Sequence, residues 1–226
     1  MRTLTKEIQE QISPAEALQI LKSGNERFIQ NLKVNRNLLE QVNITTNGQW
    51  PFAVVLSCID SRTSAELIFD QGLGDIFSVR IAGNIVNDDI LGSMEFACKI
   101  AGSKFILVLG HKKCGAIKGA CDHVEMGHLT GLLSKIEPAI EEENTTLEER
   151  HSGNADFVEN VARINVTRSV QEILNKSTIL SEMVAEGKIG ICGAMYDVTT
   201  GEVEFYENTI TLNPLVKRVD EVELAH

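Results

Sequence analysis

The strongest constraint on the fold of this 226-residue chain is a series of short, continuous apolar runs separated by segments with helical spacing. Residues 52–56, 76–81 and 105–109 are such runs, and 189–196 is a fourth, so each predicts a buried strand. Gly110 is expected to end the third strand. Continuous apolar strands that alternate with helices are typical of a mostly parallel central sheet with helices on both faces. The sequence therefore predicts an α/β fold.

Other segments complete the predicted sheet and its cover. Helical spacing recurs between the strands, at residues 90–100, 115–120, about 128–143 and 155–174. A Thr-Gly turn at 200–201 leads from the fourth strand into a short run at 203–206, which predicts a hairpin. The sheet is thus expected to carry one antiparallel edge strand.

The N-terminal part reads differently from the rest. Residues 13–16 have the residue types of a capping box, with Pro14 at the first helical position, so a helix is predicted to run to about Ile29. Residues 31–48 are polar and predict a loosely structured connection. We expect one domain over 1–226, built from an N-terminal helical arm (1–48) and an α/β core (49–226).

Composition excludes several classes of protein. The chain has 21 Lys and Arg against 32 Asp and Glu, a formal net charge of −11, which argues against binding to nucleic acid or to an anionic membrane surface. No apolar stretch approaches the roughly 18–20 residues of a membrane span, and the first residues lack the apolar core of a secretion signal. Five cysteines are too few, and odd in number, for a disulfide framework, so a cytoplasmic protein is expected.

Chemically active side chains follow two of the predicted strands. Cys58, Asp60 and Arg62 come directly after the first strand, and His111 and Cys114 come directly after the third. The carboxyl ends of parallel strands meet at one edge of a sheet, where ligands of open α/β sheets bind. We therefore expect these five side chains to lie close together.

Two thiolates and one imidazole are a suitable donor set for zinc, which accepts sulfur and nitrogen and prefers four ligands. Three protein ligands leave one position open, the pattern of a catalytic site. The other cysteines, Cys98, Cys121 and Cys192, fall on apolar faces and are expected to pack in the interior. A cysteine-based phosphatase is disfavoured because Ser64 stands where its arginine would be needed.

Together, Cys-x-Asp-Ser-Arg from residue 58 and His-x-x-Cys from residue 111 resemble the paired signature of the β-class carbonic anhydrases. The similarity extends to the short sequence segments at 49–51, 77–84 and 193–198, and covers most of the chain. The resemblance implies reversible hydration of CO2 to bicarbonate and a proton by attack of zinc-bound hydroxide. It also implies one Zn²⁺ per chain, and either a homodimer or a tetramer built from such dimers.

The resemblance also assigns roles to individual residues. The implied zinc ligands are Cys58, His111 and Cys114, and the implied catalytic dyad is Asp60 with Arg62. The implied substrate-binding residues are Gln49, Phe77, Ala82, Phe96 and Gly115, with part of the CO2 pocket supplied by a partner subunit.

Within that family, the sequence is more similar to the plant-like subgroup than to the bicarbonate-regulated bacterial one. Val55 stands three residues before Cys58, where the regulated subgroup carries tryptophan, and Gln49 is present. Ala82 and Phe96 replace the valine and tyrosine common in the pocket, which implies an altered pocket shape.

Two other interpretations stay open at this stage. The same fold could hydrolyse carbon disulfide or carbonyl sulfide, as some relatives do. Alternatively, the chain could be an inactive zinc-binding module with a structural or redox-sensing role, although such a module would need neither Asp60 nor Arg62.

Overall fold

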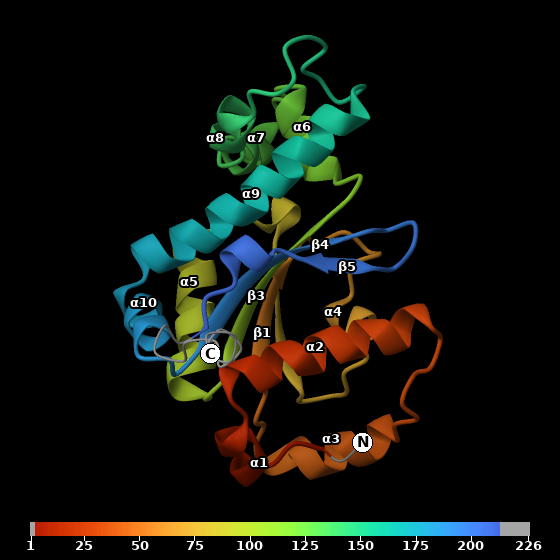
Figure 1. Cartoon of the computed structure of the whole chain (residues 1–226), viewed down its shortest axis with the longest axis vertical. Helices are drawn as coiled ribbons and strands as arrows, with labels where there is room; N and C mark the ends of the chain where they lie inside the picture. Colours follow the sequence, from red (N-terminus) through yellow and green to blue (C-terminus); the bar gives the residue numbers. More distant parts are fainter. Residues whose placement is uncertain (1–2, 213–226) are drawn as a thin grey trace, which may run out of the picture.

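The computed structural model describes residues 3–212, and its centre is a five-stranded sheet in the order β2-β1-β3-β4-β5 (Figure 1). The strands are β1 (Ala53–Ser57), β2 (Ile76–Arg80), β3 (Phe105–His111), β4 (Gly190–Tyr196) and β5 (Val203–Phe205). The first four run parallel and β5 pairs antiparallel with β4, as the sequence predicts. Every residue of β1, β3 and β4 is buried, which explains their uninterrupted apolar runs.

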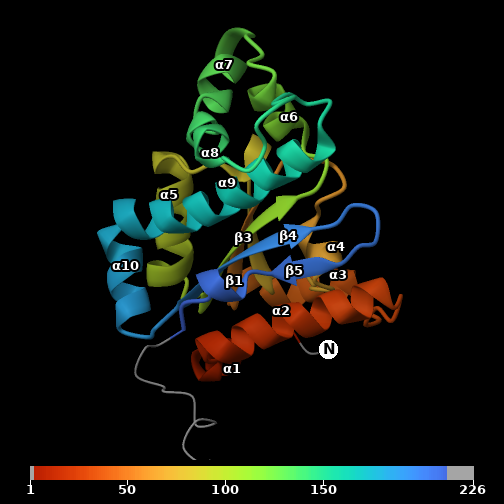
Figure 2. The same ribbon diagram turned by 45° about the horizontal axis from the view of Figure 1, so that its top comes forward.

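Helices cover both faces of this sheet. The helices are α1 (Lys6–Gln11), α2 (Pro14–Ile29), α3 (Leu38–Ile44), α4 (Ala65–Ile68), α5 (Asp88–Glu95), α6 (Gly115–Cys121), α7 (Gly127–Leu133), α8 (Glu137–Glu142), α9 (Ala155–Lys176) and α10 (Thr178–Ala185). Figure 2 shows α2 on one side of the sheet and α5, α9 and α10 on the other. Among the described residues, no helix is long and apolar enough to cross a membrane.

The capping box predicted at the start of α2 is present. Ser13 Oγ accepts a hydrogen bond from the N–H of Glu16 at 3.2 Å, and the Glu16 carboxylate accepts one from the N–H of Ser13 at 2.8 Å. The apolar side chains of α2, which include Leu18 and Leu21, are buried against the sheet. The helix of the expected arm is therefore packed against the sheet of its own chain.

Two predictions about the connections are wrong. Residues 31–48 contain the helix α3, which begins where Asn37 Oδ1 accepts a hydrogen bond from the N–H of Glu40 at 3.1 Å. The single helix expected over 128–143 is divided into α7 and α8, and Pro138 lies in the first turn of α8, where its missing N–H is tolerated. The sequence does not predict the helices α1 and α10.

Gly110 does not end the third strand, contrary to the prediction. β3 continues through His111, because Gly110 serves close packing and not chain reversal. A side chain at this position would place its Cβ 2.5 Å from Cγ2 of Val166, which lies on α9. Because Gly110 has no side chain, α9 can pack close to the sheet. The strand continues past Gly110, and His111 is its last residue.

Candidate metal centre

The structure brings Cys58, His111 and Cys114 together at the carboxyl edge of the sheet. One ligand atom from each of the three lies within 4.8 Å of the others, and all three residues are buried. Cys58 follows β1, and His111 closes the neighbouring strand β3, which pairs with β1 in parallel. Cys114 immediately precedes α6, and its Sγ lies 3.9 Å from Sγ of Cys58. The juxtaposition expected from the two motifs is thus confirmed.

The ring of His111 is oriented so that Nε2 can bind a metal ion. Its Nδ1 lies 3.0 Å from the carbonyl oxygen of Lys112, so the proton belongs on Nδ1 and Nε2 carries the lone pair. Nε2 is buried and has no hydrogen-bond partner among the described residues. Because a buried polar atom normally has a partner, this orphaned nitrogen fits a bound metal ion.

The two sulfurs are polarised by their surroundings. The hydrogen bond with Cys114 lowers the pKa of Cys58 most, and the N–H groups of Gly83 and Asp60 lower it further, although burial opposes them. The neighbouring Cys58 sulfur and burial raise the pKa of Cys114. Two sulfurs and one imidazole nitrogen are the donor set that zinc prefers. The residues present therefore fit a zinc ion.

Asp60 lies beside this cluster and is held by Arg62. Its Oδ2 is 3.9 Å from Nε2 of His111. Hydrogen bonds from the Arg62 side chain hold the pKa of the Asp60 carboxyl well below its usual range, with smaller help from the Arg62 N–H. Asp60 is therefore an ionised acceptor at the edge of the candidate metal centre.

The turn that carries Cys58 and Asp60 is fixed by β2. Arg80, at the end of that strand, donates from Nε to the Cys58 carbonyl at 3.0 Å and from Nη2 to the Asp60 carbonyl at 2.6 Å. The Thr63 hydroxyl donates to the same two carbonyls at 3.0 and 2.8 Å. The Arg80 contacts could not be read from the sequence, because they depend on how β2 lies beside β1, whereas the Thr63 contacts are local to the turn.

The expected substrate-binding residues are distributed unevenly around the cluster. Ala82 precedes Gly83, whose N–H contacts Cys58, and Gly115 follows Cys114. Phe77 and Phe96 contact each other edge to face, with ring centroids 6.3 Å apart, and Phe96 is 53% exposed. Gln49 is exposed, and no hydrogen bond within residues 3–212 joins it to the cluster.

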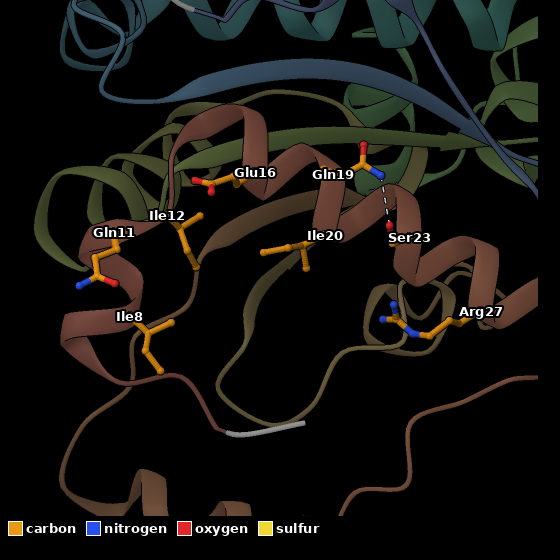
Figure 3. A pocket seen from close by; sticks show the side chains of 8 residues that line it. All are labelled: Ile8, Gln11, Ile12, Glu16, Gln19, Ile20, Ser23 and Arg27. Atoms are coloured by element: carbon orange, nitrogen blue, oxygen red, sulfur yellow. Dashed lines mark hydrogen bonds between the residues drawn. The ribbon is translucent and has the colours of Figure 1, made fainter.

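A separate hollow lies between α1 and α2 and has a volume of about 450 Å³ (Figure 3). Its apolar side chains include Ile8, Ile12 and Ile20. None of the residues predicted to bind metal or substrate lines it. This hollow is therefore distinct from the candidate metal centre.

A mostly parallel sheet with a Cys-His-Cys cluster at its carboxyl edge defines an α/β protein with a candidate metal site. The sequence model of the carbonic anhydrase family matches residues 53–203. A carbonic anhydrase of Mycolicibacterium smegmatis is 36% identical over 199 residues, which cover 85% of this chain and 93% of that protein. This chain belongs to the carbonic anhydrase family.

Solved structures place the fold in the β class of that family. A β-carbonic anhydrase of Aspergillus fumigatus superposes with a TM-score of 0.69 at 23% identity, covering 85% of this chain and 90% of that chain. One of two tetrameric β-carbonic anhydrases of Sordaria macrospora superposes with a TM-score of 0.66 at 23% identity, covering 85% and 95%.

Proposed function

We propose that this protein catalyses the zinc-dependent, reversible hydration of CO2 to bicarbonate and a proton. The observation that carries the proposal is the buried cluster of Cys58, His111 and Cys114 with the ionised Asp60 at its edge, in a chain of the carbonic anhydrase family. A structural zinc site would have no use for the Asp60–Arg62 pair. The pair therefore favours an active enzyme over an inactive module.

Cys58, His111 and Cys114 would hold one Zn²⁺ per chain. When bound, zinc lowers the pKa of a water molecule and so supplies a nucleophile near neutral pH. Two thiolates and a neutral imidazole leave a bound Zn²⁺ with almost no net charge, which weakens this effect. The N–H groups that point at the sulfurs would offset part of that loss by drawing negative charge away from the metal ligands.

Asp60 would orient the nucleophile. As an ionised carboxylate it can only accept hydrogen bonds, so it fixes the direction in which a neighbouring O–H group points. Arg62 engages both carboxylate oxygens and so keeps Asp60 in place beside the centre. This arrangement supports our assignment to the plant-like subgroup. In that subgroup the aspartate stays paired with the arginine, so the fourth coordination position of the metal ion is open.

CO2 is apolar and needs an apolar pocket with few polar contacts. Phe77, Ala82 and Phe96 would form the apolar wall, and the N–H of Gly115 at the start of α6 would hold a substrate oxygen. Gln49 is exposed in its own chain. We assign it to substrate orientation in a pocket that a partner subunit completes.

A homodimer, or a tetramer of dimers, is supported by exposed apolar side chains near α3 and α4. Those more than 45% exposed are Leu38, Leu39, Val42, Ile44, Ile59 and Leu67. Exposed apolar clusters of this kind commonly mark an interface between proteins. Sedimentation equilibrium measures the state directly, and a monomer at micromolar concentration would contradict this part of the proposal.

All five cysteines are buried and none is in a disulfide, which supports a cytoplasmic location.

The proposed reaction is tested by stopped-flow hydration of CO2, with zinc quantified on the same sample. We expect about one zinc per chain and a catalysed rate that disappears in Cys58→Ser, whereas Cys98→Ser, a buried thiol outside the cluster, keeps it. Carbon disulfide and carbonyl sulfide are assayed in parallel. Zinc-loaded protein that hydrolyses only the sulfur compounds, or that turns over none of the three substrates, would overturn the proposal.

A further inference from the structure

Two buried polar side chains of α9 bind the turn next to the candidate metal centre. Asn165 donates from Nδ2 to the carbonyl of Gly83 at 2.9 Å, and Ser169 donates from Oγ to the carbonyl of Asn84 at 3.2 Å. Both side chains are buried, and they lie one helical turn apart on the same face of α9. Figure 1 shows α9 crossing the sheet on this side.

The turn that they bind, Ala82–Asn84, touches a predicted metal ligand. The N–H of Gly83 donates to Sγ of Cys58, with N and S 3.4 Å apart. Gly83 has φ 69° and ψ 15°, a left-handed conformation that favours glycine. A Cβ at this position would also lie 2.8 Å from Cδ1 of Ile136. Glycine is therefore favoured at this position, and because glycine has the freest backbone, contacts from elsewhere in the chain must hold it in this conformation.

Burying the polar side chain of Asn165 at this position costs free energy. The buried side chains around it on α9 include Val161, Val166 and Val170, so the site is largely apolar. An amide in such a place needs its hydrogen bonds, and an apolar residue of similar size would pack there without that need. Core packing alone therefore gives no reason for an asparagine at this position.

We propose that Asn165 is a positioning residue of the metal centre. By holding the carbonyl of Gly83, it fixes this residue in the left-handed conformation that points its N–H at the sulfur of Cys58. A hydrogen bond to a ligand sulfur draws electron density from it, so the sulfur donates less to a bound metal. The metal then keeps more positive character despite its two thiolate ligands. This inference rests on the metal site of the proposed function.

The test is the absorption spectrum of the cobalt-substituted protein. Charge transfer from thiolate sulfur to Co²⁺ gives a band whose energy falls as the sulfur becomes more electron-rich. We compare Asn165→Ala with Ser169→Ala, which removes a hydrogen bond from the same helix to the next residue of the same turn. The band is expected at longer wavelength in Asn165→Ala and close to its wild-type position in Ser169→Ala. No shift in Asn165→Ala, or equal shifts in both variants, would overturn the inference.

A second measurement needs no variant, in case Asn165→Ala does not fold. In the wild-type protein loaded with ¹¹³Cd²⁺, the amide proton of Gly83 is expected to show a scalar coupling to cadmium across the N–H···S bond to Cys58. Absence of that coupling, with the Gly83 amide assigned, would refute the inference. Neither readout uses CO2. A protein that shows the coupling and the shift without hydrating CO2 would therefore refute the proposed function and leave this inference standing.

Discussion

Asp60 and Arg62 form a two-point ion pair, in which Nε of Arg62 donates to Oδ1 of Asp60 at 2.9 Å and Nη2 donates to Oδ2 at 2.7 Å. The N–H of Arg62 donates to Oδ1 as well, at 2.9 Å. The planar guanidinium matches the geometry of the carboxylate, and an ammonium group could not do the same. The pair therefore fixes both the charge and the direction of Asp60.

Replacing Asp60 with asparagine tests its role as an acceptor. Asp60→Asn keeps the size of the side chain but replaces one acceptor oxygen with a donor, so the proposed orientation of the nucleophile is lost. Hydration of CO2 is expected to fall by about 10–100-fold with zinc content unchanged, as is usual when a residue next to a metal ligand is altered. Asp122→Asn, which changes an aspartate at the far end of α6, is the control. Equal rates in Asp60→Asn and wild type would exclude the proposed role.

Substitution of Arg62 separates its charge from its geometry. Arg62→Lys keeps a cation but can make only one contact at a time with Asp60, and Arg62→Ala removes both contacts. We expect the hydration rate to fall in the order wild type, Arg62→Lys, Arg62→Ala, with a loss of about 10–100-fold in the last. Arg168→Lys alters a surface pair with Glu142 and serves as the control. A lysine variant as active as wild type would show that charge alone is sufficient.

Removal of the metal is expected to change the reactivity of one set of thiols only. Burial raises the pKa of Cys98 to about 12, and the pKa values of Cys121 and Cys192 to about 11. The hydrogen bond with Cys114 lowers the pKa of Cys58. Because the thiolate is the reactive form, an alkylating reagent at pH 8 should label Cys58 in the chelator-treated protein and spare Cys98.

Mass spectrometry of peptides after timed alkylation measures this difference. Restoring Zn²⁺ should protect Cys58 and leave Cys98 as it was. Labelling of Cys98 as fast as Cys58 in the metal-free protein, or no protection by zinc, would contradict the proposed ligand set.

The parts of the structure that depend on neighbouring residues were predictable from the sequence. The capping box at Ser13 and Glu16 is a local contact, and the strands that precede Cys58 and His111 carry their own apolar pattern. Once the strands are known to be parallel, the two motifs must meet at one edge of the sheet. The site was therefore predictable to the level of which side chains converge.

The contacts that tune the site were not predictable, because they join segments far apart in the chain. Asn165 on α9 reaches Gly83, and Arg80 at the end of β2 reaches Cys58 at the end of the neighbouring strand β1. The prediction that Gly110 ends the third strand is wrong for a related reason. A glycine can mark either the end of a strand or a close approach of another element, and only the position of Val166 decides which.

The N-terminal helices are tied to the turn after α4 by an ion cluster around the buried Asp70, which offers a test of acid stability. Arg27 on α2 and Arg36 just before α3 both donate to its carboxylate, whose side chain is only 3% exposed. Burial pushes the pKa of Asp70 up, but the two guanidinium groups and the N–H of Val34 push it further down, so the net shift is downward. The unfolded chain therefore binds this proton at a higher pH, near 4, than the folded protein does.

It follows that the stabilisation from ionised Asp70 is fully present above about pH 4 and is lost as the pH falls through the lower folded pKa. Asp70→Asn should reduce the free energy of unfolding by about 3–5 kcal/mol at pH 7, because it leaves the largely buried Arg36 and the partly buried Arg27 without their anion. The difference from wild type should shrink as the pH is lowered below 4. Urea unfolding at several pH values measures it, with Glu142→Gln in an exposed pair as the control, expected within about 1 kcal/mol of wild type. A deficit in Asp70→Asn that stays constant from pH 7 to pH 3 would show that the carboxylate charge contributes nothing to holding the N-terminal helices.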